Sequence, residues 1–237
     1  MFVILHFFLA TGAFLGYNGV RQGGKPPMSK NALHPGWPER QQEVIKLKSK
    51  TKSIVGIGLF TAIVVVLQLL GTPLKLGMFA GAVALLPIVV GAGLYGWKAG
   101  AWLGFAFGAT VLLSGDAAPF MAISIPGTII TVLSKGCGCG TVAGLVHKLL
   151  QRYNKTVAAY VAAIVAPVVN TGIFALGCYV FFYQALAGWN AESVAPFANT
   201  TAYIFLGLIG TNFFVEVGTS VVLAPVITRL IKMGNKQ

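Results

Sequence analysis

The chain has 237 residues, of which 56% are hydrophobic and only 9% are charged, whereas soluble domains carry about a quarter charged residues. Between Ser53 and Val226 only nine residues are Asp, Glu, Lys or Arg, and apolar runs of about 20 residues match the length of a membrane-spanning helix. This composition excludes an ordinary soluble domain and predicts an all-α membrane protein. The formal charge of +12 does not indicate a nucleic-acid partner, because the basic residues cluster at segment ends. Such clusters are typical of membrane orientation and of contact with anionic lipid.

The first 27 residues do not match the rest of the chain. Residues 1–17 are apolar but short, without a preceding basic residue or a clear cleavage site, which argues against a signal peptide. The run 22–25 (Gln-Gly-Gly-Lys) lies just before Met28, and a purine-rich run that resembles a bacterial ribosome-binding sequence could encode it. We expect residues 1–27 to be a non-native leader from a misplaced start, with translation beginning at Met28. An additional anchor helix is the alternative.

Residues 28–52 are polar and basic, and they are predicted to form a cytoplasmic segment that becomes helical near its end. A six-transmembrane-helix bundle follows over residues 53–232, with a cytoplasmic tail at 233–237. Gly71-Thr72-Pro73 ends the first helix, and residues 114–126 and 188–200 are predicted outer loops. The fifth helix exceeds a perpendicular span, so it is expected to tilt or to bend at Pro167. The predicted helices are 53–70, 79–94, 99–113, 127–150, 156–186 and 202–231.

The distribution of Lys and Arg predicts the orientation of the bundle. Six helices place both ends of the domain on one side of the membrane. That side holds nearly all the basic residues that flank the helices, whereas the outer loops hold only Lys75. Cytoplasmic loops carry the excess of Lys and Arg, so both termini are predicted to be cytoplasmic. The inner residues are Arg40, Lys46, Lys48, Lys50, Lys52, Lys98, Lys148, Arg152, Lys155, Arg229, Lys232 and Lys236.

Four polar residues within the apolar runs are candidates for binding a solute. Lys135 falls in the fourth predicted helix, Asn170 in the fifth, and Asn212 and Glu216 on one face of the sixth. Polar groups at membrane depth usually face a bundle interior or a cavity. One interpretation is a pocket in which Lys135 holds a carboxylate and the amides bind hydroxyl or amide groups. The other is that Lys135 and Glu216 pair while Asn170 and Asn212 tie helices together.

The remaining motifs point away from catalysis and metal binding. The three cysteines lie in apolar stretches without a nearby His: Cys137, Cys139 and Cys178. We expect them to pack against neighbouring side chains and not to bind a metal ion. We also expect no cofactor. There is no phosphate-binding Gly-x-x-x-x-Gly-Lys-Ser/Thr loop in the chain, and His147 lies too close to a predicted membrane edge to serve a buried nucleophile.

Small residues in the first predicted helix allow another helix to approach closely. Gly58 and Ala62 are four residues apart, a spacing typical of packed membrane helices. Spacing alone favours a neighbour from the same bundle over a partner subunit.

Three features together resemble the substrate-binding S components of energy-coupling factor (ECF) vitamin transporters over residues 53–232. They are the six helices with cytoplasmic ends, the Gly58-x-x-x-Ala62 pair, and the runs 87–100 (PIVVGAGLYGWKAG) and 166–172 (APVVNTG). The resemblance implies capture of a vitamin from outside, a pocket built by the later helices and outer loops, and residence in a bacterial plasma membrane.

The resemblance also implies partners. Such proteins act with a membrane coupling subunit and two ATPase subunits, and a small-residue motif in the first helix contacts the coupling subunit. The first position here is Gly58 where the family has Ala. Lys135 makes pantothenate the first candidate substrate, with riboflavin and nicotinate open. The alternatives are a stand-alone secondary carrier or channel, a membrane-embedded enzyme, and a structural subunit without a ligand.

Overall fold

The computed structural model describes residues 39–71, 78–193 and 196–234, and these residues form helices without any strand. The predictions for residues 1–27 and for Lys75 lie outside these ranges. Six helices in the described part have 18 residues or more: α2 (Glu39–Gly71), α3 (Met78–Tyr95), α4 (Trp97–Ser114), α6 (Ile125–Leu150), α7 (Lys155–Phe181) and α10 (Thr211–Gly234). The shorter elements are α5 (Ala118–Ile123), α8 (Tyr183–Ala191), α9 (Thr200–Ala202) and the π-helical η1 (Tyr203–Gly210).

Four helical segments of the described chain are long and apolar enough to cross a membrane: 51–70, 125–150, 155–181 and 200–233. A shorter apolar helix covers residues 83–95. Their outward surfaces are apolar too, since Phe214 and Val222 are both 74% exposed. The prediction of an all-α membrane fold is therefore confirmed in its class. The number of spans stays a prediction, because α4 has Lys98 as its second residue and contains several glycines, which reduce its apolar character.

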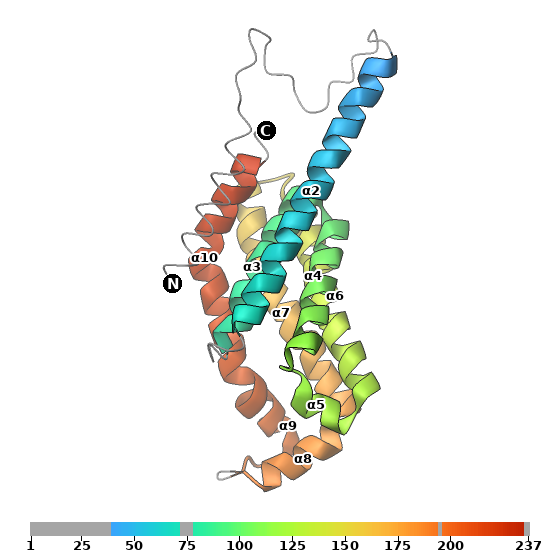
Figure 1. Ribbon diagram of the computed structural model, residues 1–237. Coiled ribbons are helices and arrows are strands. Elements are labelled where there is room, and N and C mark those ends of the chain that lie inside the picture. Colours follow the sequence, from blue (N-terminus) through green and yellow to red (C-terminus); the bar gives the residue numbers. More distant parts are fainter. Residues whose placement is uncertain (1–38, 72–77, 194–195, 235–237) are drawn as a thin grey trace.

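The two ends of the bundle differ in the helices that form them (Figure 1) and in their charge. The N-terminal half of α2 and the C-terminal end of α10 lie at one end, and α5, α8 and α9 lie at the other. The sequence of α5, α8 and α9 contains no Lys or Arg. The exposed cations cluster at the α2 end, as Lys52, Lys98, Lys148, Arg152, Lys155, Arg229 and Lys232.

The predicted helix boundaries need correction near α5, α8 and η1. Residues 156–186 were expected to form one helix, which is wrong: α7 ends at Phe181, Phe182 has φ −123° and ψ 0°, and α8 starts at Tyr183. Pro167 lies inside α7 without ending it. The predicted loop 114–126 contains α5, and Gly115 precedes it with a positive φ of 85° that favours glycine. The predicted loop 188–200 begins inside α8, and the predicted single helix 202–231 is divided into the π-helical η1 and α10.

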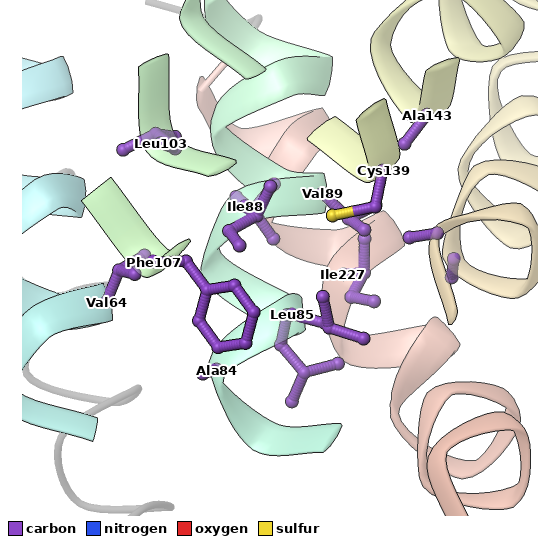
Figure 2. Close-up of a cluster of buried hydrophobic side chains, with 14 of the residues drawn as sticks. Val64, Ala84, Leu85, Ile88, Val89, Leu103, Phe107, Cys139, Ala143 and Ile227 are labelled. Carbon is purple, nitrogen blue, oxygen red and sulfur yellow. The ribbon is translucent and has the colours of Figure 1, made fainter. Parts of the chain in front are cut away.

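A continuous apolar core lies between the long helices of the bundle (Figure 2). Helix α3 lies at its centre, because the run from Ala84 to Val90 is almost entirely buried. Side chains from α2, α4, α6, α7 and α10 pack around it, and small alanines on α7 allow close contact. Residues labelled in the figure include Val64, Leu85, Ile88, Leu103, Phe107, Cys139 and Ile227.

Glycines bring α4 and α6 into backbone contact. A Cβ on Gly104 would collide with the carbonyl group of Gly136, and a Cβ on Gly100 would collide with that of Gly140. These positions recur every four residues, as at close helix interfaces in membranes. Helix α6, which carries Lys135, is thus fixed against α4 on one side and packs on α7 on the other.

Candidate functional site

Helices α6 and α7 run antiparallel and bring their polar residues into register. Thr131 of α6 faces Gly177 of α7, where an added Cβ would meet the threonine side chain. Lys135, one turn along α6, lies beside Phe174, nearly one turn back along α7. The contact face of α7 therefore presents Gly177, Phe174 and Asn170 in succession, from the α5 end toward the apolar core.

The ammonium of Lys135 lies over an aromatic ring. Its Nζ is 5.0 Å from the centroid of Phe174, within the range of a cation–π interaction, which is worth about 2 kcal/mol when desolvated. Among nearby carboxylates, Glu216 exerts the strongest electrostatic attraction on Lys135, ahead of Asp116. Lys135 is partly buried in the first half of α6, far from the cluster of exposed cations. It is thus a charge within the apolar bundle that contacts the Phe174 ring and is attracted by the Glu216 carboxylate.

Phe120 of α5 joins this ring to a second hydrophobic cluster. Its ring centroid lies 5.5 Å from that of Phe174, 5.1 Å from Phe182 and 5.9 Å from Trp189. Buried residues from α7, α8 and η1 complete the cluster at the end of the bundle away from the exposed cations. The aromatic contacts are edge-to-face, a geometry that stabilises such pairs. Lys135 thus lies where an aromatic cluster meets the bundle interior. The buried members of this cluster are Cys178, Phe182, Leu186, Ile204 and Ile209.

Glu216 is buried in α10 with 3% of its side chain exposed. Its carboxylate accepts a hydrogen bond of 3.2 Å from the Thr171 hydroxyl on α7. A carboxylate at this depth is costly unless it is hydrogen-bonded or compensated by a cation. Thr171 supplies the bond and Lys135 the attraction, so α6, α7 and α10 meet in one polar cluster.

Asn170 precedes Thr171 and is also buried, with 5% of its side chain exposed. Within the described part of the chain its Oδ1 accepts no hydrogen bond, a situation that costs about 1–3 kcal/mol for a buried group. Asn212 lies in the first turn of α10, and its side chain is outside the described part. The structure therefore places three of the four predicted residues, Lys135, Asn170 and Glu216, close to the α6–α7 interface.

Sequence reasoning missed several side chains of this cluster. The sequence did not distinguish Phe174 and Thr171 from other residues of an apolar helix. Phe174 does lie four positions after Asn170 and therefore on the same helix face. Phe120 belonged to a predicted loop, so its contacts with α7 and α8 were not foreseeable. Asp116 receives a hydrogen bond of 2.6 Å from Gln68 of α2, which joins segments 48 residues apart.

Within the described ranges no three His, Cys, Asp or Glu side chains gather as possible ligands of a metal ion.

The Gly58–Ala62 face of α2 is exposed. A Cβ added to Gly58 would meet nothing within 4 Å, and Ala62 is also exposed. Gly56 is the glycine of α2 that faces the bundle, where it contacts the Tyr95 side chain. The close approach allowed by Gly58 and Ala62 is thus not used by a neighbouring helix of the described bundle.

Comparison with known protein families matches residues 52–228 to the family described as the substrate-specific component of ECF transporters. No curated protein and no solved structure matches the chain. The match covers nearly all of the helical domain, from the start of the apolar part of α2 to the last turns of α10. Members are substrate-binding transport subunits of the membrane, not enzymes, and they work with membrane coupling and ATPase subunits. The chain belongs to the family of ECF transporter substrate-specific components.

Proposed function

We propose that this S component captures a small, water-soluble carboxylic acid from the outer side of the membrane, with pantothenate as the first candidate. The proposal rests on the position of Lys135. This residue belongs to an apolar helix, and its ammonium lies 5.0 Å from the centroid of the Phe174 ring. A cation at this depth is costly to maintain. A bound carboxylate would compensate it, and the aromatic side chains around Phe120 would contact the apolar part of the ligand.

The orientation follows from the exposed cations. Because Lys and Arg are enriched in cytoplasmic segments, the end of the bundle with Lys148, Arg152 and Lys155 is the cytoplasmic one in our proposal. Both termini of a six-span bundle then lie in the cytoplasm of a bacterium, and α5, α8 and α9 face outward. The ligand would approach Lys135 from the end at which Phe120 and Trp189 gather.

The other candidate residues have complementary roles in this proposal. Asn170 and Asn212 bind hydroxyl or amide groups of the ligand through their carboxamides, and Glu216 is the fourth ligand-binding residue. The Thr171 hydroxyl, which donates to Glu216, fixes the orientation of that carboxylate. Lys135 remains the only cation proposed to contact the ligand.

The partner surface is proposed to be the exposed face of α2. Gly58 and Ala62 are both open to approach, so a helix of the membrane coupling subunit would pack closely there. We propose that two ATPase subunits complete the importer. Binding to such a partner would give a role to the small residues on a surface that otherwise faces lipid.

Native mass spectrometry of the purified protein tests the capture proposal directly. Protein released from detergent is expected to carry one small molecule, whose mass identifies it as a carboxylic acid. K135M protein prepared in the same way should have lost that molecule, whereas K98M protein should retain it. A co-purified molecule without a carboxylate would contradict the proposed substrate class.

A further inference from the structure

We infer that Asn170 and Glu216 form a hydrogen-bond-accepting pole beyond Lys135, so that the captured molecule is an acid that also carries N–H or O–H donors. This inference rests on the proposed function and narrows it. Nothing in the role given to Lys135 alone requires the ligand to donate hydrogen bonds. The requirement comes from the two groups that lie on the core side of Lys135.

The first step is the position of Asn170. It lies four residues before Phe174 on α7, about 6 Å along the helix axis and on the same face. Phe174 is the ring that contacts the Lys135 ammonium. Asn170 is therefore one turn deeper than the cation, on the side of the apolar core rather than on the side of Phe120.

The second step is the hydrogen bonding of Asn170. Its side chain is 5% exposed, and in the described structure its Oδ1 has no hydrogen-bond donor. Asn190 of α8 offers a direct comparison, since it is also buried but its carboxamide is satisfied: Oδ1 accepts from the Phe197 amide at 2.9 Å, and Nδ2 donates to the Phe197 carbonyl at 3.1 Å. Buried carboxamides normally have such partners. Asn170 thus lacks a donor that a bound molecule would supply.

The third step is the neighbouring charge. Thr171, adjacent to Asn170, donates to the Glu216 carboxylate, which places a second acceptor at the same depth. An ionised carboxylate only accepts hydrogen bonds, and an ammonium only donates them. The cluster therefore has a donor at Lys135 and acceptors one turn deeper. A complementary ligand has a carboxylate for Lys135 and donors for the acceptor pole.

This polarity separates the candidate substrates by their chemistry. Pantothenate has a carboxylate for Lys135, and it has an amide N–H and two hydroxyl groups that can donate to the acceptor pole. Panthenol, in which a hydroxymethyl group replaces the carboxylate, has donors for the acceptor pole but no carboxylate for Lys135. Nicotinate has a carboxylate but no N–H or O–H donor when ionised, so it matches only Lys135.

The decisive variants are N170L and N190L, in which leucine replaces a carboxamide of similar size. In the ligand-free protein N190L should lower the thermal unfolding midpoint by about 3 °C or more, because it breaks two hydrogen bonds. N170L should leave the midpoint unchanged or raise it, because it removes a buried polar group without a partner. A clear fall in the midpoint for ligand-free N170L would show that Asn170 ties helices together, and would overturn the inference.

Titration calorimetry with the three compounds then separates this inference from the proposed function. N170L should weaken pantothenate and panthenol binding about tenfold each and leave nicotinate unchanged, whereas K135M should weaken only the two acids. Equal affinity of wild type and N170L for pantothenate and panthenol would overturn the acceptor pole. If the wild type binds neither pantothenate nor nicotinate, the proposed substrate class fails, and the ligand-free unfolding of N170L still decides the role of Asn170.

Discussion

Lys135 and Glu216 attract each other electrostatically, yet each is engaged by a side chain of α7. The ammonium lies over Phe174, and the carboxylate accepts from Thr171. This arrangement bears on whether the two charges exist to pair with each other. A double-mutant cycle of K135M and E216Q, measured by unfolding of ligand-free protein, should give a coupling energy of about 0.6 kcal/mol, the average for polar contacts between membrane helices.

A tightly compensated pair would behave differently in that cycle. Removing one partner of a buried ion pair costs about 3–5 kcal/mol, because the remaining charge loses its compensation. Strong destabilisation by K135M that E216Q largely reverses would therefore indicate a structural pair. T171V serves as the control for Glu216, since it removes the hydrogen bond without changing either charge.

The backbone contact between α4 and α6 predicts a sharp difference between glycines. Gly104→Ala should destabilise the protein by about 1–3 kcal/mol, because its Cβ would overlap the Gly136 carbonyl and push the helices apart. Gly172→Ala is the matched control, since this glycine also lies inside a helix but has open space around it. Its replacement should be neutral or stabilising by up to about 1 kcal/mol. Chemical unfolding in detergent measures both; equal effects would show that the α4–α6 contact is looser than described.

Because Gly58 lies on the exposed face of α2, a larger side chain at this position is predicted to hinder binding of the coupling subunit. Gly58→Leu should weaken co-purification with the membrane coupling subunit about tenfold or more, while ligand binding by the isolated subunit stays unchanged. Gly218→Leu on α10 is the control, because Gly218 is also exposed with nothing within 4 Å of an added Cβ. Normal assembly of the Gly58→Leu variant would place the partner surface elsewhere.

Much of the fold was predictable from the sequence because the bilayer imposes long apolar helices. Lys135, Asn170 and Glu216 were identifiable for the same reason, since a polar residue in such a run needs a special environment. The break at Phe182 was not predictable, because neither proline nor glycine marks it. The π-helical segment from Tyr203 to Gly210 is likewise made of residues that would also suit an ordinary α-helix.

The contacts that give the cluster its polarity could not be read from the sequence. Phe174 meets Lys135, and Thr171 meets Glu216, only through the register of α6, α7 and α10, which depends on packing between helices. Gly58 illustrates the same limit. Its spacing from Ala62 favoured a contact inside the bundle, whereas the structure leaves it exposed and uses Gly56 for the contact with Tyr95.

The affinity for pantothenate of wild type, K135M and K98M tests the central claim most directly. Lys98 is the matched control, because its Nζ also lies over an aromatic ring, 5.7 Å from the Trp97 centroid, but it is exposed at the opposite end of the bundle. Isothermal titration should show binding by wild type and K98M with equal dissociation constants. K135M should bind at least about tenfold more weakly, a loss of about 1.4 kcal/mol. A dissociation constant unchanged by K135M would contradict the assignment of Lys135 as the carboxylate-binding residue.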